Sequence, residues 1–278
     1  MTLATQAHPL TFHPVYRFLK TPKGLLLALL TAMTLVALST QPFDDAAPAV
    51  LSAMAVAALL DMTIIWVMRN ELEFPSGALL TGLIVGVILR PQEASLVVIA
   101  VAVIAIVSKH VLRTRWSNIF NPAALALVVS SFLFSTGQSW WGSMPDLGPL
   151  GLVVLFAGGL FIADRINKLP LVVVFLGAYF ALFTVASFLG EPVNVAEVFR
   201  TPDLQATLFF AFFMVDDPPT CPIRYEDQIP FGVIVAIASF IIFIVVGAVY
   251  FLPAGLLVAN AWESGRRQFG RTFRQLLA

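Results

Sequence analysis

The sequence is poor in charged residues and in cysteine. Only 12% of its 278 residues are Asp, Glu, Lys or Arg, whereas soluble domains carry roughly 25%. A soluble chain of this length needs more polar surface to cover its outside. The single cysteine, Cys221, excludes a disulfide framework within the chain and a cysteine-rich zinc or iron–sulfur site. The scarcity of charge predicts a membrane protein.

Other absences exclude further functions. The chain has 16 basic and 16 acidic residues, so no excess of positive charge points to a nucleic-acid partner. Its three histidines are too scattered for a convincing metal site. No Walker loop, GxGxxG motif or HExxH motif is present, so the sequence predicts no ATP, nicotinamide or metalloprotease machinery of its own.

Apolar residues, in contrast, are abundant and arranged in continuous runs. They make up 59% of the chain, and the mean hydropathy is +0.91. Continuous rather than alternating runs favour helices over a barrel, because backbone amides in hydrocarbon must be bonded internally. We expect an all-α membrane protein in a lipid bilayer, with helices at 24–39, 46–68, 75–90, 94–108, 121–136, 149–163, 169–189, 204–215, 229–248 and 250–263. Several are shorter than the roughly 20 residues of a full span.

The positions of the basic residues test this count. With the N-terminus inside, 14 of the 16 fall in inner loops or at the two ends, and only Arg90 and Arg200 fall outside. This distribution obeys the positive-inside rule. It predicts a bacterial-type cytoplasmic (inner) membrane protein with both termini cytoplasmic: an N-terminal segment 1–23, one transmembrane domain 24–263, and a basic tail 264–278.

Ten helices divide into two sets of five, about 24–136 and 149–263, and the second set starts from the opposite side. Breaks occur at matching places: Arg90-Pro91 corresponds to Asp217-Pro218, and Asn121-Pro122 corresponds to Pro253-Ala254. Short, proline-interrupted helices at equivalent positions of an inverted repeat point to a site near the bilayer midplane. The alternative is that each proline only begins or ends a helix.

Three carboxylates stand in or beside apolar runs. Asp216 and Asp217 follow the run 208–215, and an ionised group near mid-bilayer costs about 2.5–3.5 kcal/mol. They therefore reach the interface, face a hydrated pocket, or only form a tight turn. Asp61 lies mid-helix without a local partner and is a functional candidate by default, although hydroxyl groups of neighbouring helices could also hold it.

The remaining polar candidates have structural or functional interpretations. Asn121 is an N-cap or a site for an anion or a ring carbonyl at a helix N-terminus. Lys109 is a solvated loop charge or pairs with a flavin phosphate or with Asp216. Asn260 is expected to bond between helices, and His110 to lie at the interface.

Aromatic residues are explained first by packing. The four phenylalanines within 209–213 favour core or lipid contact over stacking on a flavin or quinone. Trp140 and Trp141 are typical of interfacial anchors. Cys221, in a predicted inner loop, is expected to be inert.

Three strings carry a resemblance to a known family. They are Ser108-Lys109 with Phe120-Asn121-Pro122-Ala123-Ala124, then Phe212-Phe213-Met214-Val215-Asp216-Asp217-Pro218-Pro219-Thr220, then Leu256-Leu257-Val258-Ala259-Asn260. Over residues 20–265 the chain resembles the D subunit of the Rnf electron-transport complex and the B subunit of the sodium-translocating NADH:quinone oxidoreductase.

The resemblance implies ten helices in an inverted repeat, a flavin, other redox or membrane subunits as partners, and coupling to sodium or proton movement. The family's covalent-FMN motif, Ser-Gly-Ala-Thr, is absent from the loop 135–146. A non-covalent flavin, FMN or riboflavin, is therefore expected. The residues predicted to bind it are Lys109, Asn121, Pro122, Asp216, Asp217, Thr220 and Asn260. Asp61 and Asp217 are the ion-coupling candidates.

Three functions follow as hypotheses. The first is a redox subunit that binds flavin and passes electrons, as a non-nucleotide-binding part of a redox-driven translocase. The second is a carrier or channel for a solute or for flavin itself. The third is an assembly scaffold that has lost its cofactor.

Overall fold

The computed structural model describes residues 17–114, 117–190, 196–247 and 249–276. Most of the predicted segment 1–23, Arg115 of the expected basic loop, and the last two residues of the predicted tail lie outside these ranges. Within them the fold is helical, and pairing between extended segments is limited to two isolated bridges, Leu89 with Gln138 and Arg113 with Asn118.

The predicted all-α fold and its apolar segments are confirmed. The helices are α2 (Pro22–Ala37), α3 (Phe43–Arg69), α4 (Ser76–Ile88), α5 (Ser95–Val111), α6 (Pro122–Phe134), α7 (Gly148–Arg165), α8 (Leu169–Leu189), α10 (Asp203–Phe210), α11 (Tyr225–Val246) and α12 (Phe251–Leu276). Short turns η1 (Leu38–Thr40), η2 (Trp141–Ser143) and η3 (Pro145–Leu147) lie in the connections, and η4 (Ala211–Val215) continues α10 as a π-helix.

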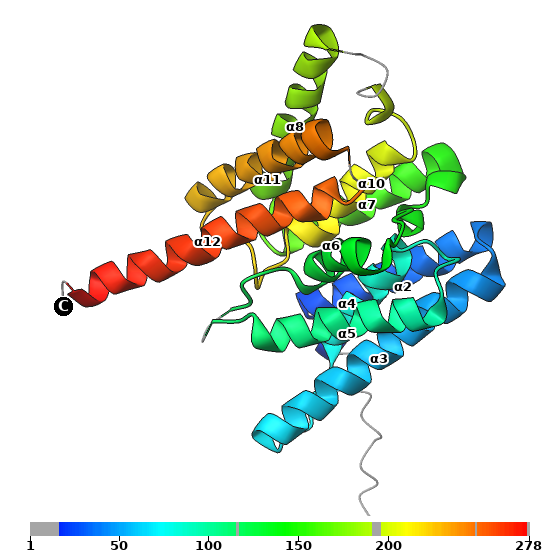
Figure 1. Ribbon diagram of the computed structural model, residues 1–278, viewed down its shortest axis with the longest axis vertical. Coiled ribbons are helices and arrows are strands. Elements are labelled where there is room, and N and C mark those ends of the chain that lie inside the picture. Colours follow the sequence, from blue (N-terminus) through cyan, green and yellow to red (C-terminus); the bar gives the residue numbers. More distant parts are fainter. Residues whose placement is uncertain (1–16, 115–116, 191–195, 248, 277–278) are drawn as a thin grey trace, which may run out of the picture.

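Helix lengths divide the bundle into two classes. Five helical segments, which contain α2, α3, α7, α8 and α11, are long and apolar enough to cross a membrane. Four apolar helices are shorter: α4, α5, α6, and α10 with η4. The chain is therefore a multi-pass membrane protein. In Figure 1, α12 extends beyond its neighbours, because the helix continues into the predicted tail as far as Leu276.

Three neighbour relations recur in both halves, whereas the packing of α3 on α4 and of α4 on α5 has no equivalent of similar extent in the second half. In the first, α3 contacts α5, α5 contacts α6, and α2 contacts α4; in the second, α8 contacts α11, α11 contacts α12, and α7 contacts α10. Between halves, α2 contacts α7 and α6 contacts α12, and each of these pairs joins equivalent helices. This pattern supports the five-plus-five arrangement (Figure 1). The boundaries at 24–136 and 149–263 and the inversion stay predictions.

Two of the short helical segments, α4 and α10 with η4, lie inside the bundle. In α4, ten of 13 residues are buried, as expected for a helix that is apolar on all sides. Long helices instead expose large apolar residues, such as Leu59 of α3 at 65% and Phe188 of α8 at 82%. The segments α4 and α10 with η4 therefore form the centre of the bundle, whereas α5 and α6 also expose large apolar residues, such as Leu96 at 80% and Phe132 at 69%.

Glycines allow two helix pairs to approach closely. A Cβ at Gly82 would lie 2.6 Å from the carbonyl oxygen of Ala53 on α3, and one at Gly255 would lie 2.7 Å from the backbone nitrogen of Ser239 on α11. Small residues at such crossings are typical of helix packing in membranes. They fix α4 against α3 and α12 against α11.

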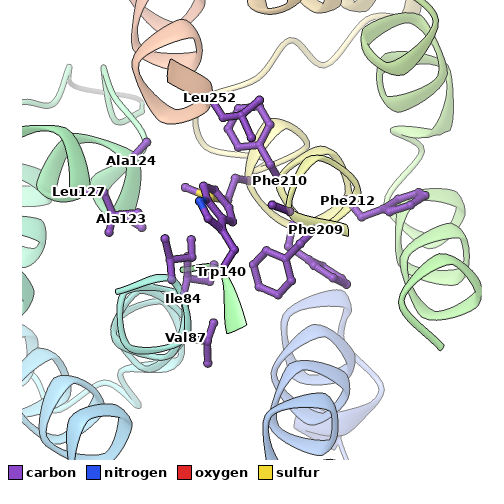
Figure 2. Close-up of a cluster of buried hydrophobic side chains, with 14 of the residues drawn as sticks. Ile84, Val87, Ala123, Ala124, Leu127, Trp140, Phe209, Phe210, Phe212 and Leu252 are labelled. Carbon is purple, nitrogen blue, oxygen red and sulfur yellow. The ribbon is translucent and has the colours of Figure 1, made fainter. Parts of the chain in front are cut away.

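An aromatic cluster fills the space between α4, α6, α10 and α12. Figure 2 shows Trp140 among Ile84, Leu127, Phe210 and Leu252, while Phe212 points away, towards Phe156 of α7 at 5.9 Å between ring centroids. The phenylalanines within 209–213 are no more than 2% exposed, which confirms that they pack in the core.

The prediction that Trp140 and Trp141 are interfacial anchors is wrong. They are only 7% and 2% exposed, and the Trp141 indole N–H donates to the Gly86 carbonyl at 3.2 Å. The loop after α6 folds back onto α4, which gives both rings a protein environment that hydropathy along the chain does not reveal.

Candidate functional site

The polar residues singled out in the sequence meet at one cavity. It has a volume of about 240 Å³ and lies where α6 begins and where α3 and α5 end. Five of the seven predicted flavin-binding residues line it: Lys109, Asn121, Pro122, Asp216 and Asp217. We call this side the basic end of the bundle, after Lys23 and Lys109 in its lining, although four carboxylates line the same cavity: Asp61, Glu73, Asp216 and Asp217. Thr220 and Asn260 lie directly behind these residues and bond to them.

Asn121 begins α6 as its N-cap. Its side-chain oxygen accepts a hydrogen bond from the Ala124 backbone N–H at 3.0 Å, so the capping interpretation is confirmed. Its Nδ2 makes only long contacts, 3.4 Å to the Met214 carbonyl and 3.5 Å to Asp217 Oδ2. Since hydrogen bonds of good strength are 2.7–3.2 Å long, this amide can still donate to a ligand.

Asn260 joins three segments of the site. Its Oδ1 accepts from the Asn121 backbone N–H at 2.9 Å, and its Nδ2 donates to the Thr220 carbonyl at 3.4 Å. The side chain is fully buried. The predicted interhelical bonding is therefore confirmed, and it links α12 to the start of α6 and to the loop after η4.

We expect Asn260→Leu to destabilise the protein by about 1–2 kcal/mol, because the buried N–H of Asn121 loses its acceptor. Unfolding by SDS titration of the detergent-purified protein measures this. Val258→Leu, on the exposed side of α12, should leave the midpoint unchanged. Equal stability of Asn260→Leu and the wild type would contradict the assigned bond.

The two aspartates of the loop differ in their partners. Asp217 Oδ2 accepts from the Thr220 hydroxyl at 3.0 Å, and the Thr220 backbone N–H donates to the Asp217 carbonyl at 3.1 Å. Asp216 is 3% exposed, and its Oδ2 has no hydrogen-bond partner in the described part of the chain. The two interpretations of Asp216 and Asp217, a tight turn and a pocket lining, are therefore both correct: the loop is a tight turn, and both residues line the cavity.

Asp61 has no local partner, as expected, but two partners on a neighbouring helix hold it, and they are charged or ring nitrogens rather than the hydroxyl groups considered from the sequence. Lys109 Nζ lies 2.8 and 2.9 Å from its two carboxylate oxygens, and His110 Nε2 lies 2.7 Å from Oδ1. The carboxylate is 2% exposed. Packing of α3 on α5 brings these residues together although 48 positions separate Asp61 from Lys109. Lys109 thus pairs with Asp61 and not with Asp216, and His110 belongs to this cluster.

Sequence reasoning missed the residues that hold the loop after η4. Lys168, 4% exposed, donates to the Pro222 carbonyl, and Arg267 Nη2 donates to the Cys221 carbonyl at 2.6 Å. Arg267 is itself bonded to buried Glu263 at 2.7 Å. One feature of the sequence could have indicated this contact: Glu263 and Arg267 stand four residues apart at the end of the last apolar run, a spacing that allows an ion pair on one face of a helix.

The Cys221 thiol is fully buried in this loop. Burial raises its pKa to about 12, so the thiol stays protonated at neutral pH and is a poor nucleophile. This agrees with the expected inertness of Cys221.

Comparison with known proteins identifies the second half of the chain. Residues 138–263 match the family described as NQR2, RnfD, RnfE, whereas no curated protein matches the chain. The matched region contains Asp216, Asp217, Thr220 and Asn260, and Asn121 and Lys109 precede it. The match agrees with the resemblance seen in the sequence: residues 138–263 are similar to the NQR2, RnfD, RnfE family.

Proposed function

We propose that the cavity at the basic end binds a flavin non-covalently and that the subunit passes electrons through it. The observation that carries this is that two residues with incompletely used polar groups line one cavity: Asn121, whose Nδ2 makes only long contacts, and Asp216, whose buried Oδ2 has no hydrogen-bond partner among the described residues. An isoalloxazine ring presents two carbonyl oxygens and one ring N–H along one edge. An amide donor and a carboxylate acceptor match that edge.

The rest of the lining suits the apolar part of such a ring. Phe74, Phe213, Leu80 and Ile84 line the same cavity, and aromatic and apolar side chains with a few placed polar groups are typical of cofactor sites. A bound flavin would supply the capacity to accept and release one or two electrons. The chain's own residues would bind the ring, orient its polar edge towards Asn121 and exclude water with the phenylalanines.

Partners are a necessary part of this proposal. The sequence contains no nicotinamide-binding motif, so electrons must arrive from another redox subunit and leave to a further acceptor. We also propose that the basic end faces the cytoplasm of a bacterial-type inner membrane, with both termini on that side, because the positive-inside rule places clustered Lys and Arg there.

A matched pair of glycine variants tests the flavin site. A Cβ at Gly77 would meet only Lys109 Nζ, at 3.8 Å, and this glycine lines the cavity; Gly177 of α8 is exposed, with nothing within 4 Å. We expect Gly77→Phe to fill the cavity and lower flavin affinity at least about tenfold. Gly177→Phe, with the same change in side chain, should bind flavin as the wild type does.

The measurement is flavin absorbance of protein purified from its native membrane, followed by fluorescence titration after the flavin is removed. Wild-type protein that is colourless and stays so after reconstitution would refute the proposal. Equal binding by both glycine variants would place the flavin outside this cavity.

A second candidate, a carrier or ion route, is favoured by a cavity on the opposite side. This cavity has a volume of about 170 Å³ and is lined by Gln138, Trp140, Asp203 and Leu252. The cluster in Figure 2 contains Ile84 and Ala123, which line the first cavity, and Trp140 and Leu252, which line the second. An apolar barrier between two cavities that each contain a carboxylate, Asp217 in the first and Asp203 in the second, suits controlled passage of an ion or solute.

For ion coupling, the contacts favour Asp217 over Asp61. Asp61 is held by Lys109 and His110, whereas Asp217 makes neutral contacts with Thr220 and Asn121. We expect Asp217→Asn to reduce ion or solute uptake into proteoliposomes several-fold, because a neutral amide attracts a cation less than a carboxylate does. Unchanged uptake by this variant would exclude Asp217 as an ion-coupling residue.

The third hypothesis, an assembly scaffold, predicts a different outcome. It would be favoured if the purified protein carries no flavin and supports no uptake but still binds partner subunits.

A further inference from the structure

The middle of α12 carries a row of polar side chains where the helix passes behind the cavity. Asn260, Glu263 and Arg267 stand three and four residues apart, a spacing that places them on one face of a helix. Asn260 and Glu263 are buried, at 0% and 1% exposed. Because a charged side chain is almost never fully buried unless it is paired, the contacts of this row show what it does.

Glu263 fixes two neighbouring arginines. Its Oε2 accepts a hydrogen bond from Arg266 Nε at 2.9 Å, and its Oε1 accepts one from Arg267 Nε at 2.7 Å. The two guanidinium groups then go to different segments. Arg266 Nη1 donates to Asp227 in the first turn of α11, at 2.6 Å. Because the guanidinium fork is planar and rigid, the bond to Nε also sets the direction in which Arg267 presents its other N–H groups.

Arg267 joins the two segments that carry polar residues of the cavity. Its Nη2 donates to the Cys221 carbonyl at 2.6 Å, and its Nη1 donates to the Ser117 hydroxyl at 3.2 Å. The Cys221 backbone N–H in turn donates to the Asp217 carbonyl at 3.0 Å, which closes the turn 217–221. Ser117 precedes Asn121, the N-cap of α6, by four residues. One side chain therefore connects both polar walls of the cavity.

We propose that Arg267 is a positioning residue for the cavity, because it holds the turn of Asp217 against the segment before Asn121 so that both residues face one ligand. Hydrogen bonds from a charged donor are stronger than neutral ones, and Arg267 makes one to each segment. Asn260 makes the same connection one turn earlier on α12, from the Asn121 N–H to the Thr220 carbonyl. The effect on flavin affinity rests on the proposed flavin site, whereas the effect on the turn does not.

The single cysteine of the chain reports on this turn. The Cys221 thiol is 0% exposed, so a maleimide reaches it only when the turn opens, and the labelling rate follows the population of the open form. In full-length protein in nanodiscs we expect Arg267→Met to raise this rate at least about tenfold, because the turn loses a hydrogen bond from a charged group. Mass spectrometry measures the labelling.

Arg266→Met is the matched control. It removes the same side chain from the next position and also takes an arginine from Glu263, but the other bond of Arg266 goes to Asp227 and not to the turn. Both variants should lower the SDS concentration of unfolding to a similar extent, while only Arg267→Met raises the labelling rate. Equal labelling rates in the two variants, or a wild-type rate in Arg267→Met, would overturn the positioning role.

Arg267→Lys keeps the test decisive if Arg267→Met does not fold. Lysine retains the charge beside Glu263 but has no fork to span Ser117 and Cys221, so the labelling rate should rise several-fold. A wild-type labelling rate in Arg267→Lys, together with a failure of Arg267→Met to fold, would show that Arg267 serves stability alone and would overturn the proposal.

Flavin titration of the same proteins separates this proposal from the flavin site. Arg267→Met should bind flavin several-fold more weakly than Arg266→Met, because the binding groups are no longer preorganised. Faster labelling with wild-type flavin affinity would overturn the positioning role. Faster labelling of Arg267→Met alone, with no flavin bound even by the wild type, would refute the flavin site and support the role of Arg267 in holding the turn.

Discussion

Lys109→Met is expected to lower the free energy of unfolding by about 3–5 kcal/mol, the range measured when one partner of a buried ion pair is removed. Asp61 is 2% exposed and takes two contacts from Lys109 Nζ, at 2.8 and 2.9 Å. Without Lys109 the carboxylate stays buried, and the contact with His110 Nε2 at 2.7 Å remains. SDS-induced unfolding of the purified protein gives the change.

A double-mutant cycle separates the ion pair from side-chain packing. Asp61→Leu combined with Lys109→Met should recover most of the loss, because replacing a buried pair with apolar residues is often neutral or stabilising. Asp61→Leu alone leaves Lys109 without its partner and should be destabilising as well. If Lys109→Met unfolds at the wild-type SDS concentration, Asp61 and Lys109 do not form the buried pair described above.

Trp141→Ala is the second substitution with a large expected effect, also about 3–5 kcal/mol, the usual cost of truncating a buried large aromatic residue. The ring is 2% exposed, and its N–H donates to the Gly86 carbonyl at 3.2 Å. The substitution leaves a cavity against α4 and an unpaired carbonyl. Thermal unfolding in detergent, followed by circular dichroism, should show a lower midpoint.

Two tryptophan variants locate the source of that effect. Trp66→Ala removes the same ring from a position of α3 that is 54% exposed, so its midpoint should change little. Trp141→Phe keeps most of the buried area and removes the hydrogen bond, so it should cost about 1 kcal/mol. Equal midpoints for Trp141→Ala and Trp66→Ala would contradict the buried packing assigned to Trp141.

Much of the fold could be predicted from the sequence, because hydropathy and helix hydrogen bonding are local. The segment 169–189 was predicted with the observed bounds of α8, and 204–215 corresponds to α10 with η4. The prediction for 250–263 was too short, since α12 continues through charged residues to Leu276. The length of an apolar run does not show how far a helix continues outside the hydrocarbon layer.

Part of the candidate site could also be predicted. Asn121, Asp216 and Asp217 interrupt or end apolar runs, where an unsatisfied polar group is costly, and all three line one cavity. The support of this site was not visible. Lys168 and Arg267 hold the loop through the carbonyls of Pro222 and Cys221, and backbone carbonyls leave no signal in a sequence.

The sequence by itself determined the membrane class, the helices and the polar positions that require a protein environment, because these depend on the free energy of placing each segment in hydrocarbon. Only the tertiary structure decided that Asp61 pairs with Lys109 and His110 and that Trp140 and Trp141 are buried. Those contacts depend on which helix faces pack together. That choice is made by side-chain shape over long sequence separations, which local hydropathy does not encode.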